Sequence, residues 1–201
     1  LKTEMKGCKM NSLNNIYDDT PFQTAGPFLH IGCLPNSIGI KNIFNHDLGM
    51  VPFDRKENAE FISISGSVFD GSGQALDDVM LETWQCDESG QFSSSQGFAR
   101  FVPNDKTKKY NLKTVKPGSV KNSDGTIQSP HILISISSRG INMSLNTRIY
   151  FEGDDFNNDP LLSFVKDDYK VSTLIAKKVD ADNYNFDIYL QGDKETVFLD
   201  I

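Results

Sequence analysis

The sequence is short of cysteine, and it has no long apolar run. Its three cysteines, Cys8, Cys33 and Cys86, are an odd number without regular spacing, which argues against a disulfide framework and favours a reducing compartment. None forms a C-x-x-C pair, so no structural zinc site is expected. No apolar run approaches the roughly 18 residues that span a membrane, and residues 1–15 have no apolar segment typical of a secretory signal. We therefore expect a cytoplasmic protein without membrane contact.

The sequence also lacks an excess of positive charge. It has 20 basic and 27 acidic residues and a formal net charge of −7, and such a chain repels the phosphate backbone. Nucleic acid is therefore not an expected partner. An acidic protein that binds an anionic small molecule would need a local cation in its pocket.

Common catalytic motifs are missing as well. The sequence contains no glycine-rich phosphate loop, H-E-x-x-H, G-x-S-x-G or EF-hand pattern. The three histidines, His30, His46 and His131, are isolated from one another along the chain. The residues alone thus reveal no catalytic constellation, and a fold by itself does not assign a function.

The sequence does contain many short segments in which apolar and polar residues alternate. In residues 61–68, Ile62, Ile64 and Val68 are apolar and serines stand between them, which predicts a half-buried strand. Further strands are expected at residues 79–85, 98–102, 110–115, 131–137, 145–151, 171–176, 184–190 and 195–199. One short helix is expected at residues 159–165, with Asp159 as its N-cap. The pattern predicts an all-β, antiparallel β-sandwich with little helix. Residues 1–20 would form an extended N-terminal arm, and residues 21–201 a single domain.

Several segments, in order along residues 20–201, are similar to those of a known enzyme family. They are T-P-F-Q-T-A-G-P-F-L-H-I-G at residues 20–32, S-G-S-V-F-D-G-S-G at 65–73, E-T-W-Q at 82–85, T-V-K-P-G at 114–118, S-P-H-I at 129–132, R-G-I-N at 139–142, L-N-T-R-I-Y-F at 145–151 and E-T-V-F-L-D-I at 195–201. Together they resemble the α-type chains of the intradiol ring-cleaving dioxygenases, in the protocatechuate 3,4-dioxygenase family.

The resemblance implies an enzyme built from two homologous β-sandwich chains, α and β. In the family the β-type chain holds a non-haem Fe(III) through two tyrosinates and two imidazoles. The catechol chelates the iron, and O₂ is inserted between the two hydroxylated carbons. This chain would then be the α-subunit of an oxidoreductase that converts protocatechuate to 3-carboxy-cis,cis-muconate. Its partner would be an iron-bearing β-subunit, and the chain alone would be inactive.

Three of the four positions that match the family's iron ligands lack a donor atom. The β-type motif W-Q-x-x-x-G-G-R-Y places one tyrosinate at Phe92, and K-P-G-P-Y places the other at Val120. The motif H-x-H corresponds to His131 and Leu133 at its two imidazole positions. Only His131 keeps a lone pair for a metal. The resemblance therefore implies no metal in this chain, with Phe92, Val120 and Leu133 in ordinary packing and His131 as a structural residue.

The resemblance also implies which residues an α-type chain lends to the partner's substrate pocket. They are Thr24, Gly26, Pro27 and Phe28, with Arg100 as the cation for a substrate carboxylate. Phe28 stands where the family usually has tyrosine, so a phenol that could bind that carboxylate is missing. The alternative interpretation is a plain Gly-Pro turn and a structural salt bridge at Arg100. Two further arginines, Arg139 and Arg148, are assigned to structure.

Two other functions stay open at this point. The chain could be a non-catalytic β-sandwich module that binds or scaffolds and has merely retained the fold. It could also be a self-sufficient dioxygenase with new iron ligands, which the red-brown colour of an Fe(III)–tyrosinate protein would reveal.

Overall fold

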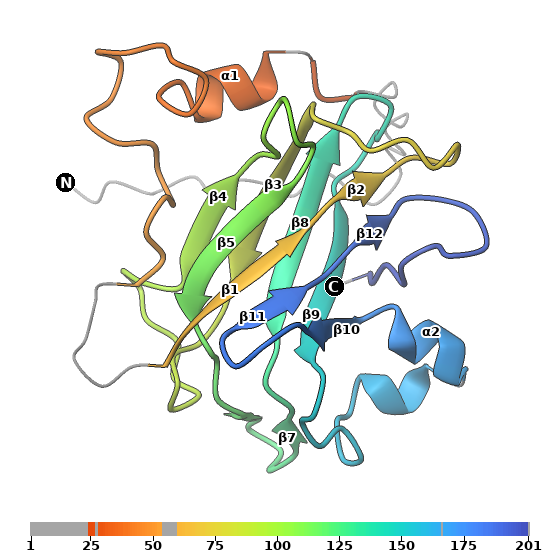
Figure 1. The fold of residues 1–201 in the computed structure, drawn as a ribbon. Helices are drawn as coiled ribbons and strands as arrows, with labels where there is room; N and C mark the ends of the chain where they lie inside the picture. The colour runs from red at the N-terminus through yellow and green to blue at the C-terminus, as the bar shows by residue number, and fades with distance from the viewer. Residues whose placement is uncertain (1–23, 27, 54–59, 166, 201) are drawn as a thin grey trace, which may run out of the picture.

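A computed structural model describes residues 24–26, 28–53, 60–165 and 167–200 of the chain (Figure 1). The helices are α1 (Leu29–Cys33), α2 (Asp168–Ser172) and the 3-10 helix η1 (Leu162–Phe164). The strands are β1 (Phe61–Gly66), β2 (Val68–Phe69), β3 (Val79–Trp84), β4 (Phe98–Phe101), β5 (Tyr110–Val115), β6 (Val120–Lys121), β7 (Ile127–Gln128), β8 (Ile132–Ser138), β9 (Leu145–Phe151), β10 (Ile175–Lys178), β11 (Asn183–Asn185) and β12 (Ile188–Tyr189). The expected N-terminal arm, residues 1–20, lies outside the described residues.

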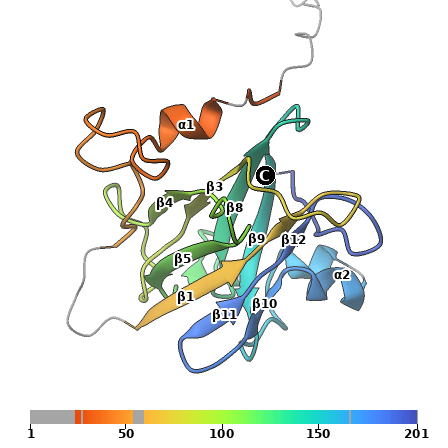
Figure 2. The ribbon, with the colours of Figure 1, turned by 45° about the horizontal axis from the view of Figure 1, so that its top comes forward.

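Eight strands form one strongly curled sheet in the order β4-β3-β8-β9-β10-β11-β1-β5. The curl brings the two end strands, β4 and β5, into contact, so that β1, β5 and β11 face β3, β8 and β9 across the core (Figures 1 and 2). This arrangement confirms the predicted β-sandwich. Three pairings, β1–β11, β9–β10 and β2–β12, are parallel, a feature that alternation along a strand does not reveal.

The core lies between the two layers and follows the alternation in the sequence. Ile132, Ile134 and Ile136 of β8 are fully buried, and Ile62 and Ile64 of β1 belong to the same apolar cluster. Each such side chain stabilises the fold by about 1.5–3 kcal/mol relative to an exposed one. The intervening residues of β8 point to the outer face, where the family's metal positions fall.

Four of the predicted strands differ from the structure. The segments expected at 61–68 and 184–190 are each divided into two shorter strands, β1 with β2 and β11 with β12. The segment expected as a strand at 171–176 begins as helix α2, and β10 starts only at Ile175. The carboxylate of Asp167 accepts a hydrogen bond from the N–H of Tyr169 at 2.9 Å, and this N-cap starts a helix before the strand. Of residues 195–199, expected as a strand, Leu199 forms an isolated bridge with Asn146.

The predicted short helix after Asp159 is present as the 3-10 helix η1. The Asp159 carboxylate accepts hydrogen bonds from the N–H groups of Leu161 (3.0 Å) and Leu162 (3.1 Å), as expected of a capping residue. In the described part of the chain, no helix combines the length and the apolar character needed to cross a membrane.

Candidate functional site

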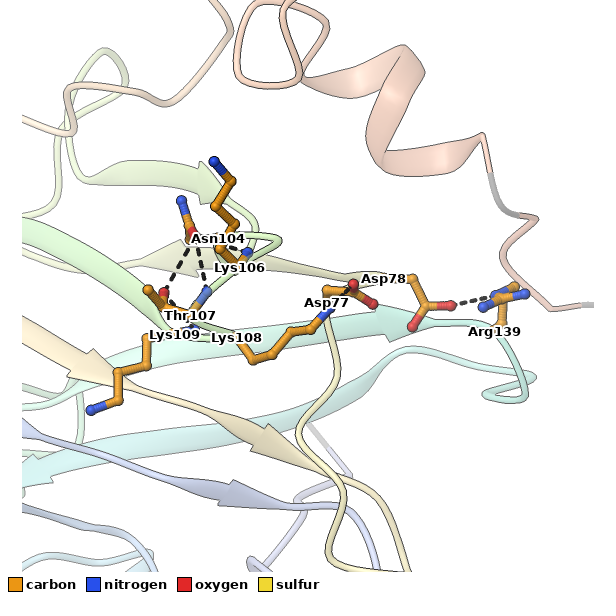
Figure 3. A network of polar contacts seen from close by, with 8 residues as sticks. All are labelled: Asp77, Asp78, Asn104, Lys106, Thr107, Lys108, Lys109 and Arg139. Atoms are coloured by element: carbon orange, nitrogen blue, oxygen red, sulfur yellow. Dashed lines mark hydrogen bonds and ion pairs between the residues drawn. The ribbon is translucent and has the colours of Figure 1, made fainter.

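Thr24 joins the N-terminal part of the chain to the turn that follows β8. Its hydroxyl donates a hydrogen bond to the Ser138 carbonyl at 3.2 Å and accepts one from the Gly140 N–H at 2.8 Å. Arg139 lies between these two anchors, and its side chain is 62% exposed. It forms an ion pair with Asp78, beside the Asp77–Lys108 pair (Figure 3). The structure therefore places a largely exposed cation next to Thr24.

The residues after Thr24 present apolar surface to solvent. Phe28 is 74% exposed at the N-terminus of α1, where its carbonyl accepts a hydrogen bond from the Gly32 N–H at 2.8 Å. Gly26 is exposed, and a Cβ added there would meet no atom within 4 Å. Packing within this chain does not require glycine at that position. Pro27 lies outside the described residues. The exposed Phe28 ring is thus free to contact another molecule.

Arg100, the arginine selected from the sequence, is bound to a partner in its own chain. It lies on β4 opposite Glu82 of β3, and the two side chains approach within 2.6 Å. Its guanidinium also lies 5.4 Å from the ring centroid of Phe98. Arg100 and Asp78 line one open cleft of about 760 Å³ below α1. Asp78 therefore connects the surroundings of Arg100 with those of Arg139.

His131, the one imidazole at the metal positions, is buried and neutral. Its side chain Nδ1 lies 2.8 Å from the Ser129 carbonyl oxygen, which can only accept, so Nδ1 carries the hydrogen. The ring packs against Tyr150 with 5.9 Å between centroids. Burial, and secondly the positive charge of Arg148, lower the pKa of His131 to about 4. These contacts hold the imidazole within the fold, and its structural role stays a prediction.

Leu133 and Phe92 meet on the outer face of the sheet through Trp84. Leu133 of β8 is paired with Trp84 of β3 and with Arg148 of β9. The Phe92 ring stacks parallel to Trp84 with 6.5 Å between centroids. Phe92 is 51% exposed, so the expectation that it lies in ordinary core packing is wrong. Trp84 is 37% exposed, so this stacked pair is partly open to solvent.

Val120 lies close to the turn that precedes Phe92. Gly90 in this turn has φ +77°, and a Cβ there would lie 2.1 Å from the Ser119 carbonyl oxygen. The turn and residue 120 are therefore close neighbours, and the four metal positions occupy one region. Among the described residues, no group of three or more His, Cys, Asp and Glu side chains could share a metal ion. One neutral imidazole among apolar side chains does not fit a ferric ion.

Arg148 also lies in this region, although the sequence analysis assigned it only a structural role. Its Nη1 donates to the Tyr150 hydroxyl at 3.4 Å, and that hydroxyl donates to the buried Asp159 carboxylate at 3.2 Å. Its Nε is buried and has no hydrogen-bond partner among the described residues. The guanidinium is a permanent positive charge beside His131. Its charge opposes a metal cation at His131, while the nearby Asp159 carboxylate acts in the opposite direction and has the smaller effect on the pKa of this histidine.

Comparison with known proteins places this fold and site in one class of protein, the ring-cleaving dioxygenases. The family model described as "Dioxygenase" matches residues 40–192, and the chain belongs to this intradiol dioxygenase family. The fold is similar to that of catechol 1,2-dioxygenase from Pseudomonas arvilla C-1, with a TM-score of 0.57 and 19% identity over 72% of this chain and 56% of the other.

Sequence comparison places the chain more closely within the family. It is 37% identical to the protocatechuate 3,4-dioxygenase alpha chain of Pseudomonas putida, over 90% of this chain and 96% of the relative. It is 26% identical to the protocatechuate 3,4-dioxygenase beta chain of Burkholderia cepacia, over 73% of this chain and 74% of the relative. The chain is thus related to both chain types and more similar to the alpha type.

Proposed function

We propose that this chain is the iron-free α-type subunit of a protocatechuate 3,4-dioxygenase-like enzyme. It completes the substrate pocket at the iron of a homologous β-type partner, where O₂ cleaves protocatechuate to 3-carboxy-cis,cis-muconate. One observation carries the proposal: a chain similar to the alpha type over 90% of its length has donor-free side chains at Phe92, Val120 and Leu133. Such a chain needs a partner that holds the metal.

In this division of labour the Fe(III) of the partner activates the catechol toward O₂. The present chain orients the substrate. Thr24, Gly26, Pro27 and Phe28 form one wall of the pocket, and the exposed Phe28 ring offers an apolar surface to the substrate ring. An arginine binds the carboxylate, because a planar guanidinium can hold a carboxylate with two parallel hydrogen bonds.

Two arginines are candidates for that cation, and the geometry favours Arg139 over Arg100. The Arg139 side chain is 62% exposed, while its partner Asp78 is 20% exposed, so water reaches the arginine end of this ion pair and screens it. A substrate carboxylate could therefore bind Arg139 from the solvent side. Arg100 is 19% exposed and binds Glu82 through both Nε (2.8 Å) and Nη2 (2.6 Å), so its release would cost more.

The test compares two substrates in a reconstituted αβ complex. Protocatechuate carries a carboxylate and plain catechol does not, so removal of the carboxylate-binding arginine should raise KM for protocatechuate far more than for catechol. We expect this selective rise for Arg139→Ala. If Arg100→Ala shows it instead, Arg100 is the pocket cation, and equal effects on both substrates would remove the tested arginine from the pocket. Lys177→Ala, which breaks an exposed ion pair with Glu152, is the matched control.

The metal assignment has a separate test. We expect this chain, purified alone, to be colourless and to contain no stoichiometric iron, and the complex with the β-type chain to be red-brown. Stoichiometric ferric ion in this chain by itself would overturn the proposed function. A folded chain that never associates with a β-type partner would instead favour the binding or scaffolding module.

A further inference from the structure

An unusual concentration of exposed apolar side chains follows helix α1. We define the apolar loop as residues 38–51. Its exposed large apolar residues are Ile38, Ile40, Ile43, Phe44, Leu48, Met50 and Val51. Their exposed fractions run from 39% to 73%, while Lys41 and Asp47 are the only formally charged residues in the segment. Clustered exposed apolar surface of this kind marks interaction sites, whereas single exposed apolar residues do not.

Hydrogen bonds to the buried Asp47 carboxylate hold the apolar loop in one shape. Asp47 is 3% exposed, and its carboxylate accepts hydrogen bonds from the N–H groups of Asn36 (3.0 Å) and Ser37 (2.8 Å). It also accepts from the Asn36 amide (3.0 Å) and the Ser37 hydroxyl (2.9 Å). Burial raises the pKa of Asp47, but these hydrogen bonds outweigh it and leave the pKa below its usual value. A loop ordered before binding loses little conformational entropy when it binds.

The inner side of the loop is fixed to the edge of the sheet. The Arg100 N–H of β4 donates to the Gly49 carbonyl at 3.2 Å, and the Gly97 N–H donates to the Pro52 carbonyl at 2.8 Å. Gly49 has φ +81°, and a Cβ there would lie 2.5 Å from the Arg100 nitrogen, so only glycine allows this approach. The loop thereby covers the edge of β4 with its backbone. Its exposed apolar side chains add nothing to that role.

We propose that the apolar loop is the surface on which this chain docks onto the homologous iron-bearing β-type chain. This inference rests on the proposed function, and it names where the two chains meet. The β-type chain is chosen as the binding partner because the apolar loop follows closely after the residues that are proposed to reach its substrate pocket. Residues 24–28 are proposed to reach the partner's pocket, and α1, a helix of about 7.5 Å, leads from Phe28 toward the loop at the same end of the sandwich (Figures 1 and 2). A partner that contacts Phe28 therefore lies beside the loop.

The composition of the apolar loop suits the centre of such an interface. A standard protein interface buries about 800 Å² per partner, with apolar and aromatic side chains at its centre. The loop provides seven large exposed apolar side chains. Polar substitution at the centre of such a patch should weaken association at least about tenfold, as for other buried anchors.

The experiment uses the full chain and the β-type chain of the same organism. That partner is recognised by tyrosines at the positions of Phe92 and Val120 and by H-x-H at residues 131–133. Association is measured by sedimentation for the wild-type chain and for the double variant Ile43→Ser/Phe44→Ser. The matched control is Phe164→Ser/Val179→Ser, whose residues are 83% and 66% exposed on other parts of the surface. All changes lie at exposed positions, so circular dichroism and Tm should match the wild type.

Selective weakening of the αβ complex by the loop variant, by tenfold or more, supports the inference. If the loop variant associates like the wild type in an active complex, docking uses another surface, and the proposed function still stands. If the loop variant abolishes only self-association of this chain, the occupant is a second copy and the inference is overturned. If the wild-type chain does not bind the β-type chain at all, both the inference and the proposed function fall.

Discussion

The neutral, buried His131 should make the stability of this protein depend on pH in a defined window. Its side chain is 8% exposed, and its pKa is about 4 instead of the ordinary 6.5. As pH falls below 6.5, the unfolded chain takes up a proton at this imidazole, while the folded chain does so only near pH 4. The contribution of His131 to stability is therefore complete above about pH 6.5 and is lost as pH falls toward 4. Because one pKa unit corresponds to 1.36 kcal/mol, the loss reaches about 2.5 kcal/mol at pH 4.5.

The measurement is the free energy of unfolding by urea between pH 4.5 and 7.5. Fluorescence of Trp84 can report it, since this is the one tryptophan of the chain and it lies beside the same region. The variant His131→Gln should show a flatter dependence, so that its difference from the wild type shrinks by about 2.5 kcal/mol over the range. Asn45→Gln, which changes an exposed side chain that does not titrate in this range, should keep the wild-type slope. Parallel curves for wild type and His131→Gln would refute the assignment of a neutral imidazole in the folded protein.

Two further predictions concern the metal positions and the pocket. The triple variant Phe92→Tyr/Val120→Tyr/Leu133→His restores every donor type of the family, yet it should bind little iron while the Arg148 guanidinium stays beside the site. Adding Arg148→Gln should raise iron content measured by metal analysis and visible absorbance, and equal iron in both variants would contradict this role of the charge. In the assembled enzyme, Phe28→Tyr should lower KM for protocatechuate about tenfold by adding a charged hydrogen bond. KM for catechol should not change, and a parallel fall for both substrates would show that the phenol does not reach the carboxylate.

The strands most readily predicted from the sequence were those with one buried and one outer face. In β1 and β8 the alternation of isoleucine with serine reports burial directly, because successive side chains point to opposite faces. The same alternation carries no information on whether a neighbouring strand is parallel. At residues 167–172 two local signals compete, and the capping carboxylate of Asp167 decides for a helix where the apolar pattern suggested a strand. The direction of a strand and the cap of a helix depend on contacts between residues, which the spacing of apolar residues along the sequence does not reveal.

The candidate site could be predicted only in part, because some of its contacts join residues that lie far apart in the sequence. Residues 24–28 stand out as a motif, but the partner of Thr24 is set by the fold, since Ser138 is 114 residues further along the chain. The resemblance pointed to Arg100 through the segment at 97–100, while the structure brings the backbone on either side of Arg139 to the Thr24 hydroxyl. The available signal was the R-G-I-N segment at 139–142, which the resemblance already included.

Arg148 adds an electrostatic reason, besides the missing donor atoms, why this region should not bind a metal ion. If Phe92, Val120 and Leu133 were the only changes, the region would be an apolar patch that a few substitutions could return to metal binding. The structure instead holds a permanent cation beside His131, connected through Tyr150 to the buried Asp159. This chain of contacts places positive charge in the region where a sister chain would place its ferric ion, and repulsion between the two grows as water is excluded. The Arg148 charge thus agrees with the proposed division of labour, in which the partner holds the metal and the proposed contribution of this chain lies in the surface around Thr24, Phe28 and the apolar loop.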